Sequence, residues 1–124
     1  MIVDGNNVMG AAADGWWRDP SAAARRLLDR IVCYAATSGQ AIELVFDVPQ
    51  SDLPEGEYGG VHLRYATRRG RDAGDDRIVE LLAAAEAIDV VVTSDRLLAE
   101  RAADYGARVI GAGAFLSWLA DANC

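Results

Sequence analysis

The stretch IDVVVTSDRLLAERAADYGARVIG, residues 88–111, predicts a strand, a helix and a second strand in direct succession. Residues 88–93 are a continuous apolar run rich in valine, which is typical of a strand buried on both faces. Residues 96–105 have a helical pattern that ends at Gly106, and residues 107–111 are again short and apolar. A unit of this kind favours two parallel strands joined by a right-handed crossover.

The same alternation of strand and helix patterns runs through the rest of the chain. Further strands are expected at residues 1–3, 41–46 and 61–66. Further helices are expected at residues 19–39, 76–87 and 114–122. The first of these helices carries its own end signals, Asp19 as a cap and Gly39 at the exit. Together these elements predict an α/β fold, with a mostly parallel sheet covered by helices on both faces.

Two segments between these elements are expected to be loops. Residues 48–60 contain two prolines, three acidic residues and three glycines, and we expect them to be the most mobile and least ordered part of the chain. Residues 68–75 form a charged loop broken by glycine. The sequence contains no internal repeat and no linker pattern, so we expect a single domain over residues 1–124.

The charged residues exclude several classes of function. The chain has a formal net charge of −7, and all 12 of its basic residues are arginines, because it contains no lysine. Receiver domains, haloacid-dehalogenase-type phosphatases and P-loop enzymes rely on a lysine near the phosphate, so its absence counts against all three. An acidic chain is also unsuited to wrapping nucleic acid through bulk charge, and any such contact must use a local arginine patch or bound metal ions.

The cellular location is suggested by the cysteines and by the lack of a membrane-spanning segment and of a secretory signal. The sequence has no apolar run of membrane-spanning length and no secretory pattern at its start. Cys33 and Cys124 are far apart and lack metal-type spacing, so we expect a buried apolar residue and a free thiol, respectively. Unpaired cysteines indicate a reducing compartment, and we therefore expect a cytoplasmic protein.

Acidic residues follow the ends of three predicted strands. These are Asp4 after residues 1–3, Asp47 after residues 41–46, and Asp95 just beyond residues 88–93. Parallel strands bring their carboxyl ends to one edge of the sheet, where ligands bind in α/β folds. Further carboxylates, Asp75 and Asp76, stand at the start of the next helix. Carboxylates held this close together repel one another unless a cation lies among them, and oxygen-only ligands suit Mg²⁺ or Mn²⁺.

Each acidic residue also has a purely structural interpretation. Asp95 precedes a helix and is suited to capping it, and Asp4 in the stretch DGNN is suited to a turn. Asp75 and Asp76 could complement a helix dipole. A structural explanation is weakest for Asp47, because this residue precedes neither a helix nor a glycine. All of these residues would have to reach the same edge by accident, which favours a shared site.

The ordered motifs of the chain resemble a known family. DGNNVMG, LVFDVP, GDDRIVELL and VVTSDRLLAERAADYGARVIG, in this order and at these separations, are similar to the NYN domain in the YacP-like branch of the PIN-like nucleases. The resemblance covers residues 1 to about 119. It implies a three-layer α/β/α Rossmann-like sandwich and a metal-dependent ribonuclease that cleaves RNA.

The resemblance also implies roles for individual residues. It gives a catalytic set of Asp4, Asn7, Asp47, Asp75, Asp76 and Asp95. Within this set Asp4, Asp47, Asp75 and Asp95 are expected to bind one or two Mg²⁺ or Mn²⁺ ions, with Asn7 adding a neutral oxygen or orienting a water molecule. Where relatives often have Ala-Asp-Glu, this chain has Gly74-Asp75-Asp76, and the shorter Asp76 has less reach to a metal. Asn6 is expected to serve only the turn, and His62 to lie within a strand without a catalytic role.

Substrate contacts are expected from residues around the acidic edge. The densest basic patch consists of Arg64, Arg68, Arg69 and Arg71, whose guanidinium groups suit phosphates, although a solvated charge run is an equally plausible interpretation. Trp16, Trp17 and Arg18 follow the first strand, and an aromatic ring there could stack on unpaired bases. We expect one tryptophan to be buried and the other exposed. Ser94 is expected to assist beside Asp95.

Two rival functions remain open from the sequence. A metal-dependent nucleotide phosphatase would use the same ligands but would favour a closed pocket over an open groove. A non-catalytic RNA-binding or partner-docking module is the rival from another class, and the retained acidic cluster argues against it. The expected partner is single-stranded RNA, and a larger ribonucleoprotein or a homo-oligomer is possible.

Overall fold

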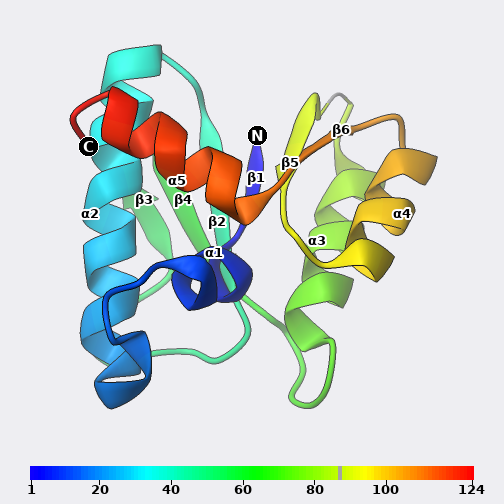
Figure 1. Cartoon of the computed structure of the whole chain (residues 1–124). Coiled ribbons are helices and arrows are strands. Elements are labelled where there is room, and N and C mark those ends of the chain that lie inside the picture. The colour runs from blue at the N-terminus through cyan, green and yellow to red at the C-terminus, as the bar shows by residue number, and fades with distance from the viewer. Residues whose placement is uncertain (87) are drawn as a thin grey trace.

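The computed structural model describes residues 1–86 and 88–124 and forms an α/β/α sandwich around a six-stranded sheet (Figure 1). The strands are β1 (Ile2–Asp4), β2 (Ile42–Phe46), β3 (Gly56–Tyr58), β4 (Val61–Tyr65), β5 (Val90–Val92) and β6 (Arg108–Ile110). Their order across the sheet is β3-β4-β2-β1-β5-β6, and every pairing is parallel except that of β3 with β4. The predicted fold class is therefore confirmed, with β1 at the centre between β2 and β5.

Helices cover both faces of the sheet. They are α1 (Gly5–Ala11), α2 (Pro20–Ser38), α3 (Ala73–Ala84), α4 (Arg96–Asp104) and α5 (Ala112–Asp121), with a short 3-10 helix, η1 (Trp16–Arg18), before α2. Side chains of α1, α2 and α5 pack on one face, and those of α3 and α4 pack on the other. The alternation along each strand divides the residues between the two layers, so that Val3 faces α2 while its neighbour Ile2 faces α3.

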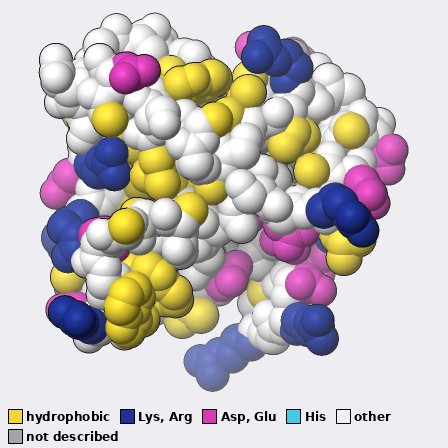
Figure 2. All heavy atoms as spheres, viewed as in Figure 1, with side chains coloured by type: hydrophobic (Ala, Val, Ile, Leu, Met, Phe, Trp, Pro, Cys, Tyr) yellow, Lys and Arg dark blue, Asp and Glu magenta, His cyan; other side chains and the backbone are white. Residues whose placement is uncertain are grey.

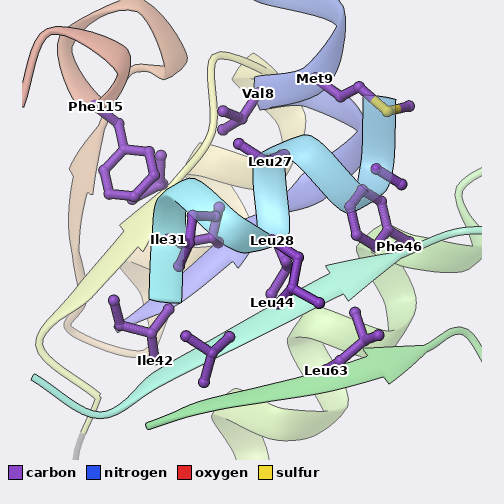
Figure 3. Packing of buried hydrophobic residues seen from close by; sticks show 14 of the residues in the cluster. Val8, Met9, Leu27, Leu28, Ile31, Ile42, Leu44, Phe46, Leu63 and Phe115 are labelled. Carbon is purple, nitrogen blue, oxygen red and sulfur yellow. The ribbon is translucent and has the colours of Figure 1, made fainter. Parts of the chain in front are cut away.

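The larger core lies between the sheet and α2 (Figure 3). Leu28 and Ile31 point from α2 toward Leu44 and Ile42 of β2, and Phe115 closes the cluster from α5. All of these side chains are almost completely buried, and burial of each stabilises the fold by roughly 1.5–3 kcal/mol. This packing fixes β1 and β2, and with them the positions of the residues that follow their ends.

The boundaries of several elements differ from those expected. Helix α1 was not predicted, because Gly5, Asn6 and Asn7 are poor helix formers. It forms because Asp4 caps it and because Gly5 allows close packing on β2, where a β-carbon at position 5 would stand 2.7 Å from the Phe46 ring. Helix α3 begins at Ala73 rather than at residue 76 and ends at Ala84. The predicted end at residue 87 lies outside the described residues.

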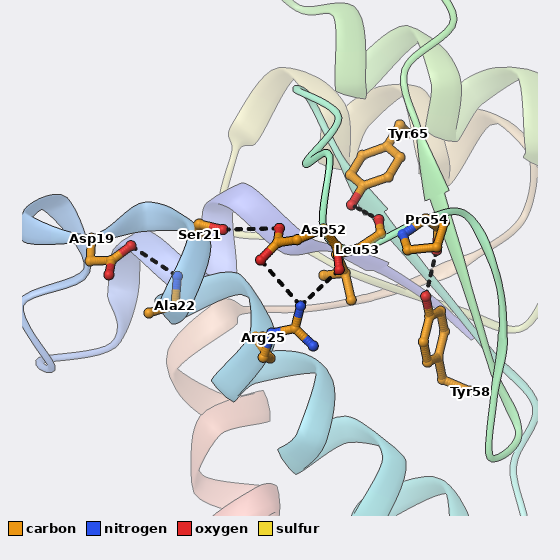
Figure 4. Close-up of polar contacts among 9 residues, drawn as sticks. All are labelled: Asp19, Ser21, Ala22, Arg25, Asp52, Leu53, Pro54, Tyr58 and Tyr65. Carbon is orange, nitrogen blue, oxygen red and sulfur yellow. Dashed lines mark hydrogen bonds and ion pairs between the residues drawn. The ribbon is translucent and has the colours of Figure 1, made fainter.

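The expectation that residues 48–60 are the least ordered part of the chain is wrong. Leu53 is buried in the core, and the Tyr65 hydroxyl donates a hydrogen bond to its carbonyl at 2.5 Å (Figure 4). The Asp52 carboxylate pairs with Arg25 of α2 at 3.3 Å. Residues 56–58 add strand β3 to the edge of the sheet. The prolines and glycines of this segment therefore shape a fixed path across the surface.

The two cysteines form a disulfide between α2 and the end of the chain. The prediction of an apolar Cys33 and a free Cys124 thiol is therefore wrong, and the cysteine-based argument for a reducing compartment falls with it. Packing of α5 against the core brings the chain end back to α2, where Arg30 Nε donates a hydrogen bond to the Cys124 carbonyl at 3.1 Å. Within the described residues, no helix has the length and apolar character needed to cross a membrane.

Candidate active site

The three predicted strand-end carboxylates meet at the lower edge of the sheet in Figure 1, where the central strands end. Asp4 is the last residue of β1 and pairs in register with Val45 of β2, so Asp47 follows only two residues further along. Asp95 follows β5 on the other side of β1. Parallel pairing of these neighbouring strands delivers the carboxylates together, as the sequence pattern indicates.

Asp4 is the buried centre of this site. Its side chain is only 6% exposed. Thr93 Oγ1 donates a hydrogen bond to Asp4 Oδ2 at 2.9 Å, and the backbone N–H of Asn7 lies 3.5 Å from Oδ1. Burial raises the pKa of Asp4 from 3.8 to about 6, and the negative charges of Asp75 and Asp47 act in the same direction, against the two hydrogen bonds. Negative charge at Asp4 is therefore costly in the absence of a cation.

Asp47 is held between α1 and the start of α3. Its backbone N–H donates to Asn6 Oδ1 at 2.8 Å, and its carboxylate lies against the backbone at Gly74. Burial raises the pKa of Asp47, the nearby N–H of Gly74 opposes this, and the negative charge of Asp72 adds to the rise. The expectation that Asn6 serves only the turn is therefore incomplete, because its side chain also fixes the backbone that carries Asp47.

Asp75 completes the set from the first turn of α3. Its pKa is raised to about 6, chiefly by burial and then by the charges of Asp95, Asp72 and Asp47, with Arg101 opposing. Asp75 and Asp95 line the same hollow of about 320 Å³ between α3 and α4. Asp95 Oδ1 also accepts the N–H of Leu98 at 3.0 Å, so the capping interpretation of this residue is correct. Its Oδ2 accepts no hydrogen bond from the residues that the structure describes.

Asp76 has a different environment from the other four carboxylates. It pairs with Arg68 and, at 3.1 Å, with Arg101. Hydrogen bonds from these two guanidinium groups hold the pKa of Asp76 below its usual value. Its charge is already compensated, and its contacts join α3 to α4 and to the loop before α3. Asp76 therefore stays outside the predicted ligand set of Asp4, Asp47, Asp75 and Asp95, and its place in the wider catalytic set remains a prediction.

Three polar side chains, those of Thr93, Asn7 and Ser94, form hydrogen bonds that fix the segments carrying the carboxylates. Thr93, which the sequence analysis missed, is buried, and its hydroxyl both donates to Asp4 and accepts the Asp95 N–H at 3.0 Å. Asn7 Oδ1 accepts the Ser94 N–H at 2.7 Å, and Ser94 Oγ accepts the Ala112 N–H at the start of α5 at 2.8 Å. A threonine at the end of an otherwise apolar strand was the available sequence signal for this role.

The donor atoms of the site suit a hard divalent cation. Asp4, Asp47, Asp75 and Asp95 offer oxygen only, and none of them forms an ion pair with an arginine in the described part of the chain. Across residues 1–86 and 88–124, no three acidic, histidine or cysteine side chains are already close enough to hold one ion. In donor chemistry and charge these four carboxylates fit Mg²⁺ or Mn²⁺, and they are the residues that would hold such an ion.

Comparison with known proteins places the chain in a family. The YacP-like NYN domain matches residues 1–123. The chain belongs to the YacP-like NYN domain family. This family is of nuclease type. No curated protein matches the sequence.

Two solved structures have the same fold as this NYN domain. Rae1 (YacP) from Bacillus subtilis is similar with a TM-score of 0.75 and 25% identity, over 98% of this chain and 74% of that chain. Its W164L mutant gives a TM-score of 0.79 and 23% identity over the same shares of the two chains. The resemblance read from the ordered motifs is therefore confirmed at the level of family and fold.

The arginines of this NYN domain are mostly committed to internal contacts. Arg64 pairs with Glu43 on the neighbouring strand at 2.5 Å, and Arg68 pairs with Asp76. Within the described residues, Arg69 and Arg71 are exposed and form no ion pair, so they remain available to a substrate. His62 contacts Glu57 across the β3–β4 pairing at 2.8 Å, in keeping with a role in the sheet.

Trp17 is 62% exposed, as expected of one tryptophan, whereas Trp16 packs against the core but is only partly buried. Arg18 lies over the Trp17 ring, 5.9 Å from its centroid. Figure 1 places η1 at the same lower end of the molecule as the strand ends and the loop before α3. On the face shown in Figure 2, hydrophobic side chains gather over η1 at the lower left. Acidic side chains gather between this region and the part of the surface formed by α3 and α4 at the lower right.

Proposed function

We propose that this chain is an endoribonuclease that uses Mg²⁺ or Mn²⁺ to hydrolyse phosphodiester bonds of single-stranded RNA. The observation that carries the proposal is the buried carboxylate of Asp4, enclosed near Asp47 and Asp75 without a paired arginine among the described residues. Carboxylates in such surroundings require a cation if they are to stay ionised together. Membership of a nuclease-type family supports the same class of reaction.

The residues proposed as ligands are Asp4, Asp47, Asp75 and Asp95. What a bound ion would supply is activation of a water molecule and neutralisation of charge on the phosphate. The protein's own contribution is to hold these carboxylates in place. Thr93 fixes Asp4 at 2.9 Å, Asn6 fixes the backbone of Asp47 at 2.8 Å, and Asn7 holds the Ser94 N–H at 2.7 Å beside Asp95.

An unpaired strand suits this surface better than a duplex. A duplex is bound through many phosphate contacts, whereas this chain has a net charge of −7 and few uncommitted arginines near the site. Trp17, exposed on η1, offers a ring for stacking, and Arg69 and Arg71 of the loop before α3 offer guanidinium groups. In Figure 1, η1 and this loop lie at opposite sides of the lower end of the molecule. Stacking and a few phosphate contacts are how proteins commonly bind single strands.

The class of substrate is tested by offering the protein single-stranded RNA, the same RNA annealed to its complement, and free nucleotides, each with Mn²⁺ or with EDTA. We expect internal cleavage of the single strand with Mn²⁺ only, and slower cleavage of the duplex. Release of phosphate from nucleotides without RNA cleavage would instead identify a phosphatase. Binding of the RNA without any cleavage would identify a non-catalytic binding module.

A further inference from the structure

A cleft of about 710 Å³ opens directly beside the carboxylates. It runs between residues 47–49, which follow β2, and residues 66–70, which follow β4. Asp47 lines both this cleft and the carboxylate edge, so a molecule lying in the cleft would be next to the reacting bond. Its volume lies within the range typical of small-molecule sites.

Both walls of the cleft are fixed by internal contacts. On one side, the segment after Pro49 is anchored through buried Leu53 and the Arg25–Asp52 ion pair (Figure 4). On the other side, the Arg68 guanidinium is paired with Asp76 and donates hydrogen bonds to the carbonyls of Arg69 and Arg71, each at 3.3 Å. The cleft therefore exists before any ligand binds, which limits the entropy lost on binding.

The lining combines an apolar surface with a cation. Val48 is 64% exposed, although it is a large hydrophobic residue, and Pro49 and Ala66 extend the apolar surface beside it. Arg69 is exposed at the rim and has no ion-pair partner within the described residues. A ligand that uses all of these features has a flat, largely apolar part and an anionic part, as a nucleotide does.

We propose that this cleft binds one unpaired nucleotide of the substrate, next to the bond that is cleaved. The base lies against Val48, Pro49 and Ala66, and its phosphate contacts Arg69. A base in a duplex is stacked and paired and could not enter, so the cleft also selects single strands. This inference rests on the proposed ribonuclease function, because RNA is the source of the nucleotide.

The test is a titration of the isotopically labelled protein followed by amide chemical shifts in NMR, with three probes: AMP, adenosine and ribose 5-phosphate. We expect AMP to shift the amides of residues 47, 48 and 66–70. Arg69→Ala should weaken AMP and ribose 5-phosphate by roughly tenfold and leave adenosine unchanged. Val48→Glu, which puts a charge on the apolar wall, should weaken AMP and adenosine. Arg108→Ala, on the exposed side of β6, is the control and should change neither.

The outcomes separate this proposal from the proposed function. Shifts confined to the Trp17 indole, or AMP binding that is equal in all three variants, would overturn the nucleotide site whether or not the protein cleaves RNA. Shifts in the cleft together with a protein that cleaves no RNA would support the site and overturn the ribonuclease. If both hold, Val48→Glu should slow cleavage of single-stranded RNA with no loss of thermal stability.

Discussion

The carboxylate of Asp47 occupies the space where any side chain of residue 74 would lie. A β-carbon built on Gly74 would stand 1.8 Å from Asp47 Oδ1. The carboxylate lies against the backbone at Gly74, where the nearby N–H lowers the pKa of Asp47, whereas Asp72 at the helix start makes no capping bond with its side chain. Glycine at this position therefore sets the direction in which Asp47 points.

Gly74→Ala should move Asp47 while leaving the fold in place. The clashing oxygen is the end of a flexible side chain, so the carboxylate would give way rather than the helix. We expect a loss of stability of roughly 0.5–1.5 kcal/mol, the size of one lost polar contact, together with a marked fall in Mn²⁺-dependent RNA cleavage. Gly113→Ala in α5 is the matched control, because among the described residues no atom outside the adjoining backbone of its own helix lies within 4 Å of the added carbon. Equal activity of the two variants would show that the position of Asp47 does not matter.

Thr93→Val should destabilise the protein through Asp4. Valine has the shape of threonine but leaves the buried Asp4 carboxylate and the Asp95 N–H without their shared partner. The expected cost is about 1–3 kcal/mol in urea-induced unfolding. Thr37→Val is the comparison, since the Thr37 hydroxyl only contacts the Cys33 carbonyl on the exposed side of α2, and it should cost far less. Similar losses for both variants would contradict a special role for Thr93.

The metal-free protein should become more stable as the pH falls from 7 to 5. Asp4 has a pKa of about 6 in the folded state, against 3.8 when unfolded, so the folded state binds a proton more tightly. The contribution of Asp4 to the free energy of unfolding is complete below its pKa in the unfolded state. It is lost as the pH rises through its pKa in the folded state. The whole effect of Asp4, between neutral pH and a pH below 3.8, amounts to roughly 3 kcal/mol, of which about 1.3 kcal/mol falls between pH 7 and pH 5. Asp75, whose pKa is also raised to about 6, acts in the same direction.

Urea unfolding at pH 5 and pH 7, with EDTA, measures this effect. Asp4→Asn should flatten the pH dependence and gain stability at pH 7, and Mn²⁺ should reduce the dependence in the wild type. The lowered pKa of Asp76 does not interfere, because its contribution is lost only below the ordinary value of 3.8. A wild type whose stability does not rise between pH 7 and pH 5, or a pH dependence that is unchanged in Asp4→Asn, would show that Asp4 is not buried as described.

Reduction of the Cys33–Cys124 disulfide should lower stability more than any change above. The bridge joins residues separated by 91 positions, and chain-entropy arguments give about 4–5 kcal/mol for a loop of this length. Guanidinium unfolding with and without reductant measures the loss, and Cys124→Ser should reproduce it without reductant. Two reactive thiols in the denatured, unreduced protein would contradict the bridge.

Local sequence patterns predicted what depends on short-range chemistry. The run of valines in β5, the caps Asp19 and Gly39 of α2, and the acidic residues after parallel strands each carry their signal within a few residues. Helix α1 carried no such signal, because its stability comes from packing of Gly5 on β2 and from the Asp4 cap.

Contacts between distant segments could not be read from the sequence. Adjacent Asp75 and Asp76 differ in environment because Asp76 pairs with Arg101, which comes from α4. The disulfide depends on α5 returning to α2, and the order of the loop after Asp47 depends on Leu53 finding a place in the core. These relationships are set by tertiary packing, which local patterns do not encode.

The most direct test of the account is cleavage of single-stranded RNA by the wild type, Asp4→Asn, Asp95→Asn and Asp29→Asn, each with Mn²⁺ and with EDTA. Asp29 lies on the exposed face of α2 and controls for the loss of one carboxylate. The account predicts metal-dependent cleavage by the wild type and Asp29→Asn, and none by Asp4→Asn or Asp95→Asn. Cleavage that persists in both site variants, or in EDTA, would contradict it.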